Sequence, residues 1–164
     1  LAFLVAVVLP AQAGNLSVSV EIPKLNVAEY HKPYVAVWIE DGNNTVVSNL
    51  AVWYDLELRN NEGEKWLKDR RQWWRRTGRS LDMPVDGVTG ATKGPGQYDL
   101  NFTAGKAPLA QLPAGDYRLQ VEAAREVGGR ELVSIPFTWP QKKGVTLNAQ
   151  GSAELGAVAL SIKP

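Results

Sequence analysis

The chain has 164 residues, with 18 Lys or Arg against 17 Asp or Glu and a formal net charge of +1. This length suits one domain with a hydrophobic core, and no stretch has the composition of a linker between two domains. The sequence has no cysteine and a single histidine, His31. This excludes disulfides, thiolate chemistry, Cys-ligated zinc and c-type haem, and leaves little for a histidine metal site or a catalytic triad.

The chain begins with an uncharged apolar run, residues 1–13, which ends in Ala11-Gln12-Ala13. This pattern matches the hydrophobic region and the small-residue cleavage site of a secretory signal. The run is too short to span a membrane, although an uncleaved anchor is the alternative. We therefore predict a signal peptide remnant at 1–13, a single mature domain at 14–164 and a periplasmic or extracytosolic location. Because the chain has no cysteine and one histidine, an electron-transfer function at that location would require an organic cofactor.

Alternating apolar residues predict the first strands. Residues 16–22 alternate apolar and polar side chains, as in a half-buried strand. Residues 35–39 are apolar on both faces and predict a central strand. After the turn residues 41–44, a return strand runs from Thr45 to about Leu58. Its predicted buried face comprises Val46, Leu50, Val52, Tyr54, Leu56 and Leu58.

The second half of the chain continues this pattern. Alternation predicts strands at 97–102 and 117–123, and the turn at Gly128-Gly129 leads into a strand at 132–139. Pro136 within that run favours an edge strand, because proline cannot donate to a strand ladder. Two C-terminal strands bring the total to about nine. We predict a mainly β fold, an immunoglobulin-like β-sandwich with one inserted amphipathic helix and one Gly/Pro-rich loop.

Between residues 65 and 76 the spacing of the large apolar side chains changes from that of a strand to that of a helix. Trp66, Trp73 and Trp74 fall on one face of a predicted amphipathic helix. Their rings either pack on the core, as aromatic stripes usually do, or stack on a cofactor. Residues 65–79 contain seven Lys or Arg and one Asp, whereas the remainder of the chain contains 11 Lys or Arg and 16 Asp or Glu. One short basic patch on an acidic body is poor support for nucleic-acid binding, so we expect no nucleic-acid partner.

The segment from Val85 to Gly96 reads VDGVTGATKGPG. Its glycines and proline are expected to keep it out of helix and sheet, as an exposed loop. Within it, DGVTGAT resembles the acceptor motif recognised by FAD:protein FMN transferases, in which the last threonine takes FMN through a phosphoester bond. By that resemblance Thr92 carries the flavin, and the recognition motif comprises Asp86, Thr89, Gly90 and Ala91. The alternative is a plain Gly/Pro turn.

Four long stretches carry a wider resemblance: EYHKPYVAVWIED, EKWLKDRRQWWRR, VDGVTGATKGPGQY and PAGDYRLQVEAAREVGGRELVSIPFTWP. With them the mature chain resembles a family of predicted periplasmic proteins, domain of unknown function 2271. The family is associated with flavinylation and extracytosolic electron transfer, commonly alongside membrane reductases with PepSY-type domains and cytochromes. The resemblance does not assign the contacts of the flavin ring. From proximity in sequence we predict Trp73, Trp74, Arg76, Lys93 and Tyr98.

Two functions compete on this sequence. In the first, FMN on Thr92 makes the protein an electron carrier between a membrane-bound PepSY-type reductase or cytochrome and another exported redox protein. In the second, the protein is a non-redox binding module whose exposed Trp and Arg side chains bind a carbohydrate or a partner protein. An enzyme acting at the tethered flavin would need a convergent pocket. We assign no catalytic residue, no metal ligand and no oligomeric state.

Overall fold

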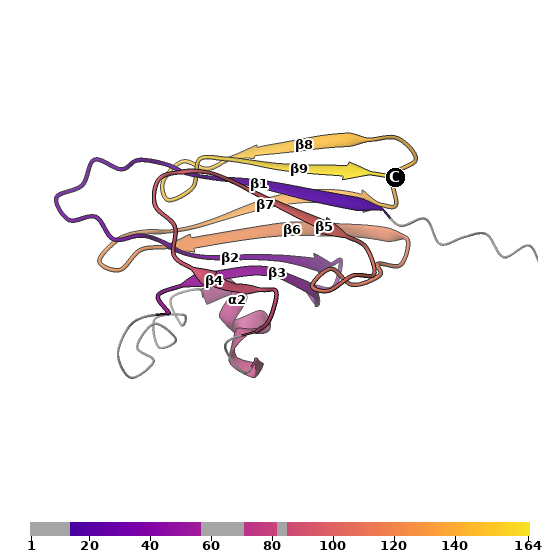
Figure 1. Cartoon of the computed structure of the whole chain (residues 1–164), viewed down its shortest axis with the longest axis horizontal. Helices are drawn as coiled ribbons and strands as arrows, with labels where there is room; N and C mark the ends of the chain where they lie inside the picture. Colours follow the sequence, from indigo (N-terminus) through magenta and orange to yellow (C-terminus); the bar gives the residue numbers. More distant parts are fainter. Residues whose placement is uncertain (1–13, 57–70, 82–84) are drawn as a thin grey trace, which may run out of the picture.

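The chain folds into two β-sheets packed face to face, with a short helix on the outer face of one of them (Figure 1). The computed structural model describes residues 14–56, 71–81 and 85–164, so the predicted signal peptide at 1–13 lies outside the described residues. The predicted mainly β, immunoglobulin-like sandwich is confirmed. In chain order the elements are β1 (Asn15–Ile22), β2 (Tyr34–Asp41), β3 (Val46–Tyr54), α2 (Arg71–Arg76), the 3-10 helix η3 (Gly78–Ser80), β4 (Thr89–Ala91), β5 (Gly96–Thr103), β6 (Gly115–Ala124), β7 (Arg130–Trp139), β8 (Val145–Gln150) and β9 (Ala157–Lys163).

One sheet has four antiparallel strands in the order β5-β1-β9-β8. On β1, the apolar residues are buried and the residues between them are exposed or half-buried. This alternation places one face of the strand on the core and the other toward solvent, as its period of two predicts. The buried residues of β1 are Leu16, Val18, Val20 and Ile22.

The other sheet has five strands in the order β4-β3-β2-β6-β7. The middle strand is β2, and its residues 34–40 are all buried, because the core covers one face of the strand and side chains around α2 cover the other. The edge strand β7 contains Pro136, which lies opposite Arg118 of β6. The predicted central strand and the predicted proline-bearing edge strand are both confirmed.

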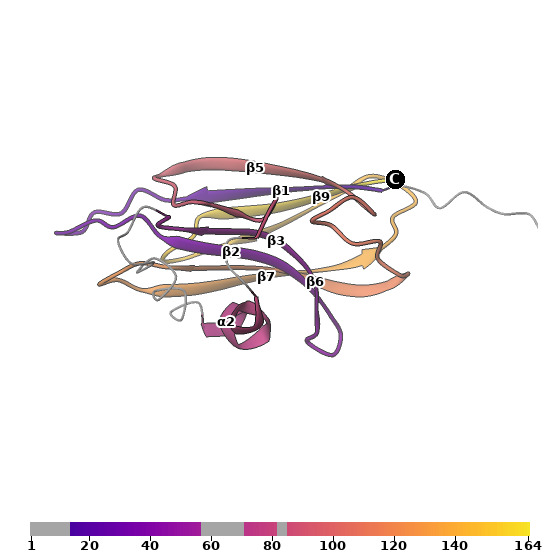
Figure 2. The same ribbon diagram turned by 60° about the horizontal axis from the view of Figure 1, so that its bottom comes forward.

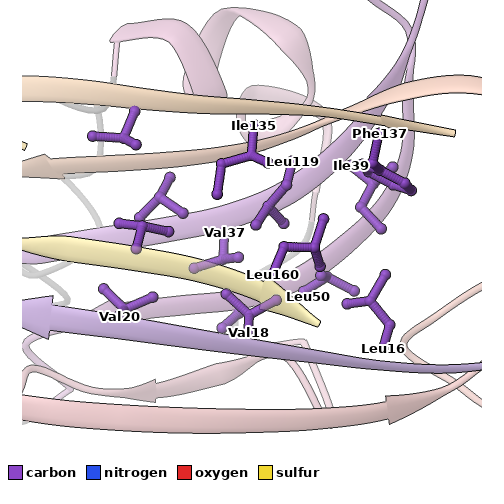
Figure 3. Packing of buried hydrophobic residues seen from close by; sticks show 14 of the residues in the cluster. Leu16, Val18, Val20, Val37, Ile39, Leu50, Leu119, Ile135, Phe137 and Leu160 are labelled. Atoms are coloured by element: carbon purple, nitrogen blue, oxygen red, sulfur yellow. The ribbon is translucent and has the colours of Figure 1, made fainter. Parts of the chain in front are cut away.

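The main core fills the space between the two sheets (Figure 3). Aliphatic and aromatic side chains from the inner faces of both sheets meet there. Burying one Val, Leu, Ile or Phe side chain contributes about 1.5–3 kcal/mol, which makes this layer the main source of stability. Its members include Leu16, Val18, Val20, Val37, Ile39, Leu50, Leu119, Ile135, Phe137 and Leu160.

The observed strand β3 corrects one prediction. Alternation predicts Leu50, Tyr54 and Leu56 on one face, but the pairing of β2 with β3 skips Leu50. This β-bulge adds one residue to β3 and exchanges its two faces. Leu50 therefore lies in the main core with Trp53, whereas Tyr54 faces the outer side. Leu56 is exposed beyond the end of the strand, and Leu58 lies outside the described residues.

A second, smaller cluster covers the outer face of the five-stranded sheet. Helix α2 lies on this face (Figure 2) and contributes Trp73. The predicted helix at 65–76 is confirmed for residues 71–76, and 65–70 lie outside the described residues. Within the described ranges, no helix is both long enough and apolar enough to cross a membrane. The buried members of the second cluster are Tyr34, Ala36, Trp38, Val52, Tyr54, Trp73 and Val88.

Candidate functional site

The segment Val85–Gly96, called the acceptor segment below, leads from one sheet to the other. Its residues Thr89–Ala91 form β4, which pairs in parallel with β3 at the edge of the five-stranded sheet. After β4 the chain crosses to β5, an edge strand of the four-stranded sheet (Figure 1). Thr92 therefore lies at the side of the sandwich, where the chain passes between the two sheets.

This arrangement corrects the prediction that the whole segment stays out of the sheet. Gly90 pairs with Trp53 of β3, and a Cβ atom added at Gly90 would lie 3.1 Å from Cδ1 of Trp53. That separation is tighter than an ordinary carbon contact, so the absence of a side chain at Gly90 lets the backbone approach the indole. Residues 92–95 are in neither helix nor strand, as predicted.

A closed turn precedes β4 and leaves Asp86 exposed. The backbone N–H of Thr89 donates to the carbonyl of Val85 at 2.9 Å, and the N–H of Val85 donates to Oγ1 of Thr89 at 2.8 Å. Gly87 has φ +73°, in the left-handed region that glycine adopts without strain. The turn therefore fixes the backbone around Asp86 while its carboxylate remains in solvent.

The two threonines of the acceptor segment differ in their hydrogen bonding. Oγ1 of Thr89 is occupied by the N–H of Val85. Thr92 is half-buried, and among the described residues its hydroxyl has no hydrogen-bond partner. Its neighbour Ala91 is small and exposed. Of these two hydroxyls, only that of Thr92 makes no hydrogen bond within the described structure.

Lys93, the residue after Thr92, lies over two aromatic rings. Its Nζ is 5.2 Å from the ring centroid of Trp53 and 5.4 Å from that of Tyr98, both within the range of cation–π attraction. The two rings meet edge to face with centroids 5.7 Å apart, and we call them the aromatic pair. The hydroxyl of Tyr98 donates to the carbonyl of Gly94 at 2.7 Å. The structure thus brings Lys93 and Tyr98 together beside Thr92.

Trp53 is the residue of this site that sequence reasoning missed. The alternation of β3 predicts it opposite Leu50, away from the buried face, and the bulge reverses that assignment. One signal was present: an aromatic side chain often covers a glycine in a neighbouring strand. Without knowledge that β4 exists, the sequence does not connect Trp53 to Gly90.

The two tryptophans of α2 belong to a different cluster from the aromatic pair. Trp73 is fully buried, and its Nε1 donates to Oδ1 of Asn49 at 2.9 Å. Trp74 is half-buried, with its ring centroid 6.5 Å from that of Trp73. Both belong to the second cluster, which also contains Val85 and Val88 at the beginning of the acceptor segment. The indole of Trp73 has no free face for a ligand, which agrees with the packing interpretation of this residue.

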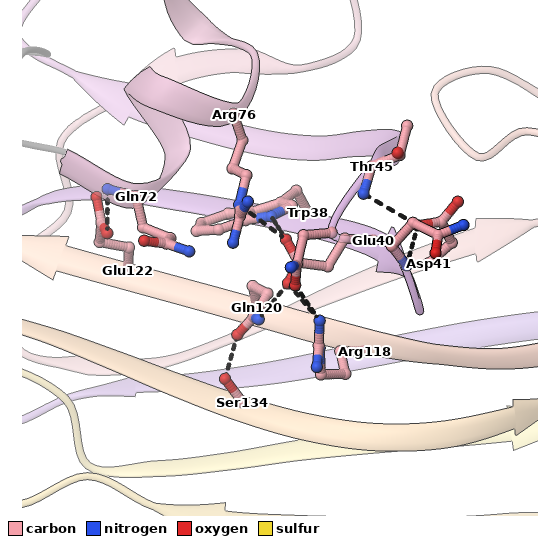
Figure 4. A network of polar contacts seen from close by, with 12 residues as sticks. Trp38, Glu40, Asp41, Thr45, Gln72, Arg76, Arg118, Gln120, Glu122 and Ser134 are labelled. Carbon is pink, nitrogen blue, oxygen red and sulfur yellow. Dashed lines mark hydrogen bonds and ion pairs between the residues drawn. The ribbon is translucent and has the colours of Figure 1, made fainter.

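Arg76, another predicted cofactor contact, is paired with a buried carboxylate (Figure 4). Its Nε is 3.6 Å from Oε2 of Glu40, which is 1% exposed. Glu40 also accepts hydrogen bonds from Nε1 of Trp38 at 3.2 Å and from Nε2 of Gln120 at 2.7 Å, and it lies 3.3 Å from Arg118. A buried carboxylate requires such partners. Arg76 therefore attaches α2 to the sheet.

An open pocket of about 330 Å³ lies at the beginning of the acceptor segment. Its lining includes Val46 of β3, Thr77, Asp86 and Pro108. The pocket adjoins the residues before β4, whereas Thr92 follows β4, so the two lie at opposite ends of this strand. They do not form one convergent site. Within the described ranges, no group of three or more His, Asp or Glu residues is placed to hold a metal ion.

Comparison with known proteins identifies the family of the chain. Residues 15–157 match the family described as "Predicted periplasmic protein (DUF2271)". The match runs from β1 to the start of β9 and includes the acceptor segment. Searches of curated proteins and of solved structures found no match. The resemblance seen in the sequence is confirmed, and the chain belongs to the DUF2271 family of predicted periplasmic proteins.

Proposed function

We propose that the protein is an exported, periplasmic electron carrier with FMN attached through a phosphoester to Thr92. The observation that carries this proposal is the contrast between two hydroxyls: the turn holds that of Thr89, while that of Thr92 is half-buried and, in the described structure, without a hydrogen-bond partner. The small neighbours Gly90 and Ala91 leave room for another enzyme. The family description and the signal-like run at 1–13 support the location.

The motif implies a FAD:protein FMN transferase as the modifying partner. Modification joins the Thr92 oxygen to the FMN phosphorus of FAD, releases AMP and transfers the hydroxyl proton to a base of the transferase. The exposed carboxylate of Asp86 is available to contact that enzyme or the divalent cation that accompanies a pyrophosphate. Because Asp86 and Thr92 flank the edge strand β4, both are presented at the same edge of the sheet.

The residues beside Thr92 fit a flavin phosphate and ring. Lys93 supplies an ammonium group next to the attachment point, and the half-buried Tyr98 and the edge-to-face Trp53 lie directly under it. FMN, when bound, supplies one- and two-electron redox chemistry. Covalent attachment maintains a high local flavin concentration without tight binding. The family resemblance implies a membrane-bound PepSY-type reductase or a cytochrome as the electron donor, and another exported redox protein as the acceptor.

The test is co-expression of the exported protein with a FAD:protein FMN transferase. We expect flavin fluorescence that persists on a denaturing gel and a mass increase equal to FMN minus water. Thr92→Ala should abolish both signals, while Thr89→Ser, which keeps the hydroxyl of the turn, should retain them. An unmodified mass for the wild type in the presence of an active transferase and FAD would refute the proposal.

The alternative of a non-redox binding module receives less support from the described residues. It requires exposed tryptophans, but four of the five described tryptophans are buried and the fifth, Trp74, is half-buried. Arg76, which lies beside them, is paired with Glu40. The buried tryptophans are Trp38, Trp53, Trp73 and Trp139. We therefore do not propose this function.

A further inference from the structure

The acceptor segment is built around the aromatic pair. Trp53 comes from β3 of one sheet and Tyr98 from β5 of the other, and their rings meet at an interplanar angle of 67°. The segment that carries Thr92 approaches both rings: Gly90 lies against the indole of Trp53, the carbonyl of Gly94 accepts from the Tyr98 hydroxyl, and Nζ of Lys93 lies within 5.4 Å of both centroids. A group attached to Thr92 is therefore attached next to an aromatic surface.

The other parts of the segment that approach this surface are backbone. Gly90 lies against the indole of Trp53, and a Cβ atom at Gly96 would lie 3.4 Å from the hydroxyl oxygen of Tyr98. The carbonyl of Gly94 accepts the Tyr98 hydroxyl hydrogen bond. Gly90, Gly94 and Gly96 can move away from the rings only if the backbone of the segment moves. The side chain of Lys93, in contrast, can leave the rings by rotation about its own flexible stem.

We propose that Lys93 is an exchangeable cover of the aromatic pair. In the unmodified protein its ammonium group lies over the rings of Trp53 and Tyr98. Once Thr92 is modified, the ammonium pairs with the phosphate on the neighbouring side chain, and the ring surface that Lys93 had covered becomes the contact surface for the isoalloxazine. Trp53 is 3% exposed, so its share of this surface is only the part under Lys93. This inference rests on the proposed function, because it requires a flavin phosphate on Thr92.

The charges favour this exchange. The phosphoester of a modified threonine is a diester and carries one negative charge, and Lys93 is the cationic residue next to it in the chain. A charge-assisted hydrogen bond from an ammonium to a phosphate is stronger than cation–π attraction at a partly exposed site. The Tyr98 hydroxyl keeps its bond to Gly94 throughout, so the segment stays in place while Lys93 moves.

The first test uses flavin fluorescence of the full chain after modification by a purified FAD:protein FMN transferase with FAD. Trp and Tyr in contact with an isoalloxazine quench its fluorescence by electron donation, whereas Phe does not. We expect severalfold weaker emission in the native protein than in the same sample unfolded in guanidinium. Trp53→Phe, which leaves the Tyr98 hydroxyl bond to Gly94 intact, should restore part of the native emission. Trp74→Phe, in the other cluster, is the matched control and should leave the emission quenched.

The second test follows Lys93 itself by NMR and needs no core substitution. The side-chain protons of Lys93 lie over the rings in the unmodified protein, so ring currents should shift their resonances upfield. Modification should remove this shift, and Thr92→Ala treated in the same way should keep it. Failure of the wild type to take up FMN would refute the proposed function and this inference together. A modified protein with unquenched emission and an unchanged Lys93 shift would overturn this inference alone.

Discussion

Gly90 lies against the indole of Trp53, with a distance of 3.1 Å between Cδ1 of that ring and the position that a Cβ atom at residue 90 would occupy. Gly90→Ala should therefore force a shift of the buried Trp53 or of β4. We expect the free energy of unfolding to fall by about 1–2 kcal/mol, as in an overpacked core. Urea unfolding monitored by tryptophan fluorescence measures this change. Gly94→Ala is the control, since no atom lies within 4 Å of its added Cβ, and an equal loss in both variants would contradict the prediction.

Removal of the hydroxyl group should destabilise the protein at Thr89 and have little effect at Thr92. Thr89→Val removes the acceptor for the backbone N–H of Val85 and should lower the free energy of unfolding by about 1–2 kcal/mol. Thr92→Val should change stability by less than about 0.5 kcal/mol, as for a surface substitution. Thermal unfolding of the unmodified variants compares the two. If Thr92→Val were the more damaging, the assignment of Thr89 as the structural residue would be wrong.

Trp73 should be required for folding and not for contact with the flavin. Its side chain is fully buried in the second cluster and hydrogen-bonded to Asn49. Trp73→Ala should therefore lower the free energy of unfolding by about 3–5 kcal/mol. Trp74→Ala, which removes a half-buried ring from the same helix, should cost clearly less. Denaturant unfolding of both variants tests the difference. Equal and small losses of stability in the two variants would show that the packing of α2 on the outer face of the sheet contributes little to stability.

The carboxylate of Glu131 predicts a pH dependence of stability. It accepts hydrogen bonds from the backbone N–H groups of residues 152–155, at 2.5–3.0 Å. Burial alone would raise the pKa of Glu131, but these four donors together lower it below its ordinary value of 4.5. Because the pKa is lower in the folded state, this stabilisation is complete above pH 4.5 and is lost as the pH falls through the folded pKa.

Glu131→Gln tests this dependence directly. At pH 7 we expect a loss of about 2 kcal/mol, since hydrogen bonds to a charged acceptor are replaced by weaker ones. The stability of the variant should also fall less steeply than that of the wild type as the pH is lowered through the acidic range. Urea unfolding across a pH series measures both effects.

Regular alternation allowed most of the fold to be predicted. The buried residues of β1 and the central position of β2 follow from hydropathy alone. A strand buried on one face has alternating apolar residues, and a strand buried on both faces has a continuous apolar run. The edge position of β7 followed from Pro136. The sequence did not predict which residues lie on each face of β3, since a bulge at Leu50 adds a residue without changing the local composition. The short strand β4 was also missed, because a pair with Trp53 outweighs the low strand propensity of Gly90.

The candidate site was predictable only where it is local in the chain. The motif from Asp86 to Thr92 is read directly from the sequence, and its role stays a prediction; in the part of the chain that the structure describes, the hydroxyl of Thr92 has no hydrogen-bond partner. The aromatic pair is not local, because Trp53 and Tyr98 come from different sheets. Proximity in sequence instead suggested Trp73, which the fold turns into the second cluster.

The crossing between β4 and β5 has a consequence for the order of maturation. This connection runs along the rim, outside the main core that the side chains of the two sheets form. If Thr92 receives FMN as proposed, the polypeptide could therefore complete its folding first. Attachment would then be a finishing step on a preassembled domain, with both sheets already packed.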